Sequence, residues 1–526
     1  MIRLARVLLL AMFAACAASA QAAGAVLTVC SESSPDGFDV AQSESTVTRD
    51  AAGHTVYDQL VRHVPGTAEL APGLAERWEL GADGLKLVLH LRRGVKFHAT
   101  PWFTPTREMN ADDVLFSMQR QADPKSPWLA MAKNGFGLWH SFGLSGDIAS
   151  IAKLDEHTVL LTLRHPSAPL LEDLANALVG SVYSAEYGAK LLASGRLEDL
   201  NTRPVGTGPF VFTSYQKDAT IRFSANRDYW GGAPKFERLV FAITPDPAVR
   251  AQRVKSGECL IGVNLKSTSL DTFADGGEVR VLAAPSQIVS YIALNTQHGF
   301  LADARLRRAL ALALDKATLL QSVYNGRAQL AASFLPPALW AHDAALAEHH
   351  DLQAARELVK ASGYDGSEFV IFTRTSGSID ALRAAELMQA DWARIGVKTR
   401  VQTMEWGEML KRVSLGEHDI TFFSWIGNAD PDSFLTPNLS CSAIASGGNS
   451  SRWCDPAFDQ VLAAARSSTD RERRKTLYAQ AQRTIAEQVP VIPTVYPYVF
   501  NAVNRKVDGF LPSPLAELNL RGLSPR

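Results

Sequence analysis

The sequence has little cysteine and almost no excess charge. It contains 5 cysteines among 526 residues, and its formal net charge at pH 7 is −1. A nearly neutral chain has no strong field to attract nucleic acid or a membrane surface, so we expect neither as a partner. Beyond residue 22 no unbroken apolar run approaches the roughly 18 residues of a membrane-spanning helix. With 46% hydrophobic and 20% charged residues, the composition is that of a folded globular protein.

Catalytic motifs are also scarce. The chain has no G-x-S-x-G elbow, no Walker loop, no H-E-x-x-H and no C-x-x-C. The Gly-Thr-Gly stretch at 206–208 is followed by Pro209 and lacks a third glycine, so a tight turn is favoured over a phosphate loop. His349 and His350 would point apart on a helix and have no companion ligands, which favours exposed helix surface over a metal site. We therefore expect no catalysis, no cofactor and no bound metal.

An acidic loop, Asp430-Pro431-Asp432, has two interpretations. Its carboxylates could form a pair for hydrolysis or for Ca²⁺ binding. Alternatively, Pro431 fixes a turn and Asp432 caps the following segment 433–435. The capped turn is the favoured interpretation, and the chemical one stays open.

Residues 1–22 are typical of a secretory signal peptide. A basic start precedes the apolar stretch 7–13 and the small-x-small exit Ala20-Gln21-Ala22. Cleavage after Ala22 would remove Cys16 and leave four cysteines in an oxidising compartment, which predicts two disulfides. The alternative is a lipoprotein in which Cys16 is the lipid-modified N-terminus, although Phe13 stands where a lipobox has an aliphatic residue.

Hydrophobic periodicity predicts an α/β protein. Strands are expected at 85–91 and 157–163, a hairpin at 210–223, and a helix at 111–120 with Asn110 as its N-cap. After residue 285 the pattern becomes strand, helix, strand, helix, strand, at 369–372, 379–395, 397–404, 408–413 and 420–425. This alternation implies a parallel sheet, whose ligands bind outside the carboxyl ends of its strands. The loops after Phe372 and Trp425 are therefore the expected binding loops.

Several motifs resemble the periplasmic dipeptide-binding proteins, which are family 5 extracellular solute-binding proteins of ABC importers. They lie at 73–80, 91–98, 109–114, 204–210, 389–392 and 425–434. The segments 102–107, 439–444 and 453–456 are closer to the Sap-type branch, which is associated with antimicrobial peptides and polyamine uptake. The likeness extends over about 26–518.

The resemblance implies a two-lobed periplasmic-binding-protein fold with an extra subdomain in the N-terminal lobe. Lobe I would comprise 23–284 and 499–526, with the subdomain at about 56–204, and lobe II would comprise 285–498. The hinge is expected near Ala284 and Tyr498. The four cysteines fall at the family's positions, which implies the pairs Cys30–Cys259 and Cys441–Cys454.

The implied function is capture of a short, dipeptide-like ligand between two closing lobes and its delivery to an inner-membrane permease coupled to ATPase subunits. We expect a periplasmic monomer. The alternative ligand is a polyamine, an antimicrobial peptide or another non-dipeptide molecule. A secreted peptidase is the alternative of another class, but the sequence offers it no nucleophile or metal triad.

The resemblance also implies ligand-binding residues, with two departures from the family. The loop after Trp425 is one residue short, so that Asn428 stands about where the family has the Asp that holds the ligand's amino group, and Asp430 is the nearest acid. The loop 373–379 is about three residues shorter than in the family and leaves Arg374 as the only candidate to hold the ligand's carboxylate. An alternative is that Arg374 merely ends its strand in solvent. The predicted ligand-binding set is Arg374, Trp425, Gly427, Asn428, Asp430, Ser45 and Thr46.

Overall fold

The computed structural model describes residues 24–132, 135–273, 277–347, 349–374, 379–446 and 448–526. The predicted signal peptide and most of the loop after Arg374 lie outside these residues. Among the described helices, none is both long and apolar enough to cross a membrane.

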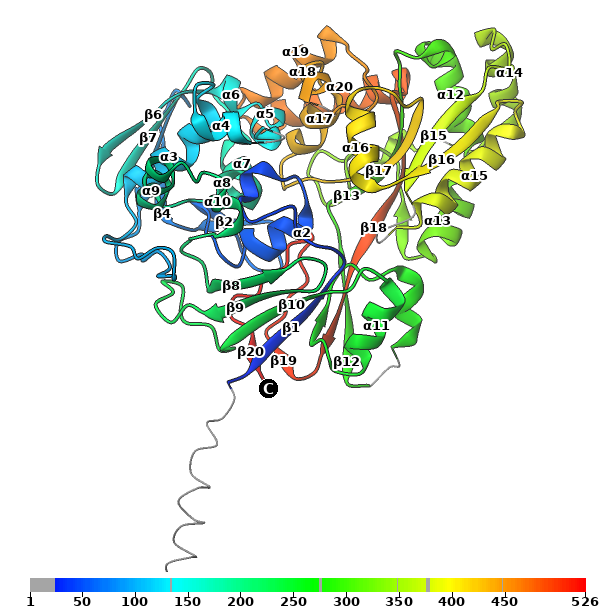
Figure 1. The fold of residues 1–526 in the computed structure, drawn as a ribbon. Coiled ribbons are helices and arrows are strands. Elements are labelled where there is room, and N and C mark those ends of the chain that lie inside the picture. Colours follow the sequence, from blue (N-terminus) through cyan, green and yellow to red (C-terminus); the bar gives the residue numbers. More distant parts are fainter. Residues whose placement is uncertain (1–23, 133–134, 274–276, 348, 375–378, 447) are drawn as a thin grey trace, which may run out of the picture.

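One large mixed sheet runs through the molecule (Figure 1). Its order is β16-β15-β17-β13-β18-β11-β1-β10-β9-β8, with β12 and β14 also paired to β18. The strands are β1 Val26–Ser31, β8 Phe210–Gln216, β9 Thr220–Ala225, β10 Arg238–Ile243, β11 Ile261–Gly262, β12 Val279–Pro285, β13 Ile288–Leu294, β14 Ala328–Leu330, β15 Phe369–Arg374, β16 Thr399–Met404, β17 Ile420–Ile426 and β18 Val491–Asn504.

Strand β18 joins the two halves of this sheet. Its first part pairs with β13 and β14, and its second part pairs with β12 and β11. Apolar clusters lie separately on the two sides. Two clusters consist of buried residues from the segments 27–279 and 502–523. The other three consist of buried residues from the segment 289–496. The molecule thus has two bodies with separate cores, and we keep the names lobe I and lobe II for them.

In lobe II the predicted alternation is confirmed. Strand β15 is parallel to both β16 and β17, and helices α15 Ala381–Ala393 and α16 Trp406–Ser414 form the connections. The other helices of this lobe are α12 Ala304–Ala313, α13 Lys316–Tyr324, α14 Leu352–Ser362, α17 Asp432–Leu439, α18 Ser442–Ser446, α19 Pro456–Arg466 and α20 Arg471–Gln488. His349 and His350 lie exposed in coil before α14, so the prediction of helix there is wrong.

In lobe I the predicted strands and hairpin are confirmed. A separate antiparallel sheet has the order β4-β5-β7-β6, from Ala75–Leu80, Lys86–Leu91, Thr158–Leu163 and Ile148–Asp155. Helix α3, Ala111–Ala122, begins with the predicted cap: Asn110 Oδ1 accepts from Asp112 N at 3.0 Å, and Asn110 N donates to Asp113 Oδ2 at 2.9 Å. The other elements used below are β2 Val61–His63, α2 Thr46–Thr48, α5 Gly137–Ser141, α6 Leu144–Asp147, α7 Leu170–Ala175 and α11 Pro247–Lys255.

The Gly-Thr-Gly stretch at 206–208 packs its backbone against residues 55–56. Gly208 N donates to Val56 O at 2.8 Å, and a Cβ on Gly206 would lie 2.0 Å from the same oxygen. The glycines therefore serve close backbone approach inside lobe I rather than phosphate binding.

Candidate ligand-binding cleft

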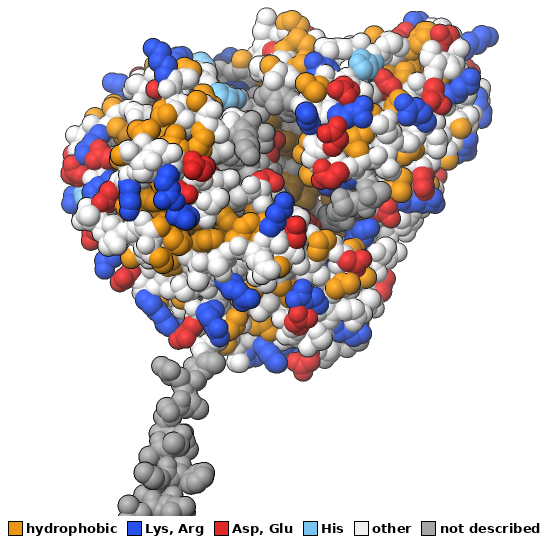
Figure 2. All heavy atoms as spheres, in the orientation of Figure 1, with side chains coloured by type: hydrophobic (Ala, Val, Ile, Leu, Met, Phe, Trp, Pro, Cys, Tyr) orange, Lys and Arg blue, Asp and Glu red, His pale blue; other side chains and the backbone are white. Residues whose placement is uncertain are grey.

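A hollow separates the two lobes on the face shown in Figure 2. In lobe I, β1 is parallel to β10 and β11, and in lobe II, β15 is parallel to β16 and β17. The carboxyl ends of these strands carry Glu32, directly after β1, and Arg374, the last residue of β15. Parallel sheets bind ligands at this edge, so both lobes bring a charged side chain to the expected place.

Arg374 is half-buried and has no hydrogen bond or ion pair with any residue that the structure describes. Its guanidinium carbon lies 4.0 Å from the centroid of the Trp406 ring, a cation–π contact that fixes the side chain without using its donors. Burial lowers the pKa of Arg374, and Glu32 opposes that shift electrostatically. Among the residues that the structure describes, none therefore uses the donors of this guanidinium.

The end of β17 and the loop after it hold the next group of predicted residues. Trp425 Nε1 donates to Ser433 O at 2.8 Å, and the indole packs against apolar clusters of both lobes. Gly427 N donates to Gln287 O at 3.2 Å, and a Cβ here would lie 2.1 Å from the Phe434 ring, so only glycine fits. The loop is therefore rigid and lies at the boundary between the lobes.

Asn428 connects this loop to lobe I. Its backbone N donates to Ser433 Oγ at 3.0 Å, and its Nδ2 donates to Asp173 Oδ1 of α7 at 3.4 Å. Asp173 is almost completely buried, and burial raises its pKa well above the usual range, although Arg466 opposes the shift.

Asp430 is already neutralised inside lobe II. Both of its carboxylate oxygens lie 2.7 Å from Arg474 Nη2, and Oδ1 also accepts from Asp432 N at 3.0 Å. Asp432 in turn pairs with Arg466. Helix α17 begins at Asp432 with Pro431 as N-cap and without a side-chain cap, so the prediction that Asp432 caps this segment is wrong.

Ser45 and Thr46 stand at the start of α2 in lobe I. Ser45 Oγ accepts from Val47 N at 3.2 Å as the N-cap, and both side chains are half-buried. Figure 1 places α2 on the side of lobe I that faces lobe II.

The lobes also meet through Arg466, at the end of α19. Its Nη2 donates to Asp147 Oδ2 at 2.7 Å and to Phe142 O at 2.8 Å, both in lobe I, while its Nη1 pairs with Asp432 of lobe II. Its backbone O accepts from Ala168 N at 2.8 Å. No local signal in the sequence could predict this bridge, because Arg466 and the lobe I partners of its side chain lie more than 300 residues apart in the chain.

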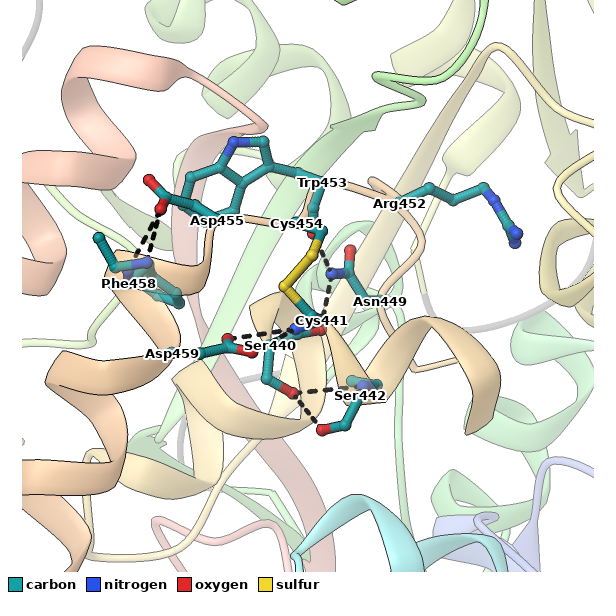
Figure 3. The surroundings of a disulfide bond; sticks show 12 residues. Ser440, Cys441, Ser442, Asn449, Arg452, Trp453, Cys454, Asp455, Phe458 and Asp459 are labelled. Atoms are coloured by element: carbon teal, nitrogen blue, oxygen red, sulfur yellow. Dashed lines mark hydrogen bonds between the residues drawn. A yellow bond between two sulfur atoms is a disulfide. The ribbon is translucent and has the colours of Figure 1, made fainter.

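Both expected disulfides are present. Cys30 of β1 is bonded to Cys259, just before β11, and Cys441 is bonded to Cys454. Figure 3 shows the second bond beside Asn449, whose Nδ2 donates to Ser440 O at 3.1 Å and to Trp453 O at 2.8 Å. The bond and the amide together hold the Gly/Ser/Asn-rich loop against α19. Within the described residues, no group of three or more His, Cys, Asp or Glu could hold a metal ion.

Comparison with known proteins gives this geometry its context. Residues 69–446 match the family model described as bacterial extracellular solute-binding proteins, family 5. The chain belongs to this family. It is 45% identical to di/tripeptide-binding protein 4 of Pseudomonas aeruginosa over 512 residues, which are 96% of each chain.

Two solved structures share the whole fold of this family 5 protein. One is a dipeptide-binding protein of Pseudoalteromonas sp. SM9913 in complex with Met-Leu, with a TM-score of 0.90, 32% identity and coverage of 95% of this chain and 100% of that one. The other is a periplasmic binding protein of Helicobacter pylori, associated with an ABC transporter and in complex with the peptide STSA. It has a TM-score of 0.91, 30% identity and coverage of 95% and 98%. The fold is thus the two-lobed periplasmic-binding-protein fold, as expected.

Proposed function

We propose that this protein captures short peptides between its two lobes and delivers them to the permease of an ABC importer. The observation that carries the proposal is Arg374, which ends β15 and has no hydrogen bond or ion pair with any described residue. A planar guanidinium binds a carboxylate through two parallel hydrogen bonds, and a peptide C-terminus supplies one. Relatives named for di- and tripeptides and a neighbour bound to Met-Leu support the same ligand class.

The cleft residues take different roles in this proposal. Arg374 holds the carboxylate, Trp425 and Gly427 form an apolar wall, and Asn428, whose amide is bonded to Asp173 and to Asp430 N, holds the loop beside lobe I. Asp430, held by Arg474, contributes to the loop's shape and field. Ser45 and Thr46 line the lobe I side. An extended peptide would further satisfy its main-chain groups on backbone amides and carbonyls of the cleft.

The same proposal includes the lobe boundaries, the cellular compartment and the lack of catalysis. We place lobe I at 23–284 and 499–526, with the extra subdomain at 56–204, and lobe II at 285–498, so that the hinge lies near Ala284 and Tyr498. The protein would work in the periplasm as a monomer after removal of residues 1–22, bind without catalysis and hand its ligand to permease and ATPase subunits.

A polyamine or another non-dipeptide ligand is the second candidate. The two departures from the family's anchor loops favour a ligand other than a dipeptide, but the pairing of Asp430 with Arg474 leaves the loop without a free acid for an amine and so argues against a polyamine. Such a ligand would leave Arg374 without a carboxylate.

Identification of the bound molecule tests the proposal directly. The purified protein is denatured, and the released ligand is analysed by mass spectrometry. Intact di- or tripeptides support the proposal and argue against a peptidase, whereas polyamines alone would overturn the peptide assignment. Calorimetry with a dipeptide panel on protein refolded without ligand then measures affinity.

A further inference from the structure

Glu32 is the acid that lies opposite Arg374. It follows β1 directly and is half-buried. Its Oε1 accepts from Asn264 Nδ2 at 3.2 Å, whereas its Oε2 is inaccessible to solvent and has no hydrogen-bond partner. A buried carboxylate oxygen without a donor is costly, so such an atom indicates a missing partner.

Nearby cations do not supply this partner. Burial raises the pKa of Glu32 and the guanidinium of Arg250 opposes that shift, but the four hydrogen bonds of this guanidinium go to backbone oxygens of residues 244, 245, 263 and 264. In the part of the chain that the structure describes, no ion pair joins Glu32 to Arg374, although each affects the pKa of the other. Both groups stand at the carboxyl ends of parallel strands, and they influence each other electrostatically without forming an ion pair.

Several other acids of this region are paired or inaccessible. Five have an arginine partner: Asp39 with Arg120, Asp50 with Arg49, Asp58 with Arg521, Asp430 with Arg474 and Asp432 with Arg466. Asp173 also has an oxygen without a hydrogen-bond partner, Oδ2, but the whole residue is only 1% exposed and its Oδ1 accepts from Asn428. Among these acids only Glu32 combines an unpartnered oxygen with a half-exposed side chain.

We propose that Glu32 of lobe I holds the ligand's ammonium group while Arg374 of lobe II holds its carboxylate, so that the cleft selects short peptides with both termini free. This assignment rests on the proposed function and transfers the ammonium role predicted for Asp430 to another lobe. A zwitterionic peptide then replaces the missing partner of each charge. Because the two anchors belong to different lobes, the ligand can satisfy both only when the lobes are closed, and it therefore favours closure.

Three ligands and three forms of the protein test this assignment by calorimetry. The ligands are Ala-Ala, N-acetyl-Ala-Ala and Ala-Ala amide, and the proteins are wild type, Glu32→Gln and Glu237→Gln. Glu237 pairs with Arg227 on the surface of lobe I, so it provides the same change of charge away from the cleft.

We expect wild type to bind Ala-Ala on the order of 10- to 100-fold more tightly than either blocked peptide. Glu32→Gln should weaken Ala-Ala by a similar factor and change N-acetyl-Ala-Ala much less, while Glu237→Gln keeps wild-type affinities. Circular dichroism and thermal unfolding confirm that Glu32→Gln is folded.

The outcomes separate the two proposals. If wild type and Glu32→Gln bind Ala-Ala equally well, the assignment of Glu32 is overturned and the proposed function still holds. An equal loss for Ala-Ala and its N-acetyl form also overturns the assignment, because the effect would then not depend on the ammonium group. Wild type that binds no di- or tripeptide of a panel overturns the proposed function, and the assignment with it.

Discussion

At the scale of single residues, charge balance decides which side chains are free for a ligand. Asp430 has its counter-ion in Arg474 of α20, and Asp432 has its counter-ion in Arg466. Both carboxylates of the acidic loop are therefore already paired within the protein. Within the described part of the chain, Arg374 has no ion-pair partner and lies on the face of the Trp406 ring. A ligand can therefore supply an ion-pair partner to the guanidinium of Arg374 but not to the carboxylates of the acidic loop.

Arg374→Ala should weaken dipeptides strongly and polyamines little. A ligand carboxylate would lose a charge-assisted pair, which costs about 3–5 kcal/mol when both groups are buried and less at this half-buried position. Calorimetry with Ala-Ala and with spermidine measures the difference. Equal dipeptide affinity in the variant and the wild type would show that Arg374 does not anchor the ligand.

Asp430→Asn should lower the free energy of unfolding, because it leaves Arg474 buried without its counter-ion. The loss of one partner of a buried pair typically costs about 3–5 kcal/mol. Asp228→Asn is the matched control, since Asp228 pairs with Lys96 on the surface, where such pairs contribute about 0–1 kcal/mol. Urea unfolding compares the two, and similar midpoints would contradict the structural role of Asp430.

At the scale of elements, covalent and ionic cross-links join segments that are distant in sequence. The bond between Cys30 and Cys259 ties β1 to the approach of β11. His63 of β2 lies 3.2 Å from Glu172 of α7 and 3.2 Å from Glu517 of the C-terminal segment. These links hold both ends of the chain on lobe I.

The disulfide between Cys441 and Cys454 should stabilise lobe II by about 3 kcal/mol, mainly because it restricts the unfolded chain. The double variant Cys441→Ser/Cys454→Ser should therefore unfold at lower urea concentration than the wild type. Peptide mapping without reductant provides the control, since it should show both native links in the wild type. Unchanged unfolding of the double variant would contradict the prediction.

His63 should make stability depend on pH between about 6.5 and 10. Burial alone would lower its pKa, but Glu517 and Glu172 outweigh burial and raise the pKa to about 10. A raised histidine pKa stabilises the fold fully below the unfolded value, about 6.5, and this stabilisation is lost as the pH rises through 10. Unfolding free energies across this range should decrease in wild type and much less in His63→Gln. The exposed His349→Gln should behave as wild type, and an identical profile for His63→Gln would refute the link.

At the scale of the whole molecule, the lobes meet on both sides of the hollow. Strand β18 and the β12–β13 connection join them along the sheet, and Arg466 bridges them through Asp147, Phe142 and Ala168. The first connection is covalent and survives opening. The second is a set of hydrogen bonds that must break when the lobes separate.

Asp147→Asn should therefore shift the protein toward an open form. Removal of the charged partner weakens the bond that only the closed arrangement makes, and ligand affinity falls by the fraction of closed protein that is lost. Small-angle scattering should give a larger radius of gyration without ligand, and calorimetry a weaker dipeptide affinity. Asp112→Asn is the control, because Asp112 pairs with Lys153 inside lobe I. If Asp147→Asn has the same scattering profile and dipeptide affinity as wild type, the Arg466 bridge takes no part in closing the lobes.

Much of the fold could be predicted from the sequence, because the relevant signals are local. The strand–helix–strand alternation after residue 285 gives a parallel sheet, and Asn110 with Asp113 gives a capped helix. The capping role of Asp432 was predicted wrongly for the same reason. A sequence window shows the acid before a helix, but it does not show Arg466, which takes that carboxylate from another helix.

The sequence by itself determined the α/β class, the family and the even set of cysteines, since periodicity, motif spacing and counting need no spatial partner. It also named Arg374, because a shortened loop left no other arginine. Only the tertiary structure decided which charges remain free. Arg474 neutralises Asp430 from a distance of 44 residues in the chain, whereas Glu32 and Arg374, 342 positions apart, influence each other electrostatically without an ion pair. Charge balance in a folded protein depends on distances through space, and these are fixed only when both cores have formed.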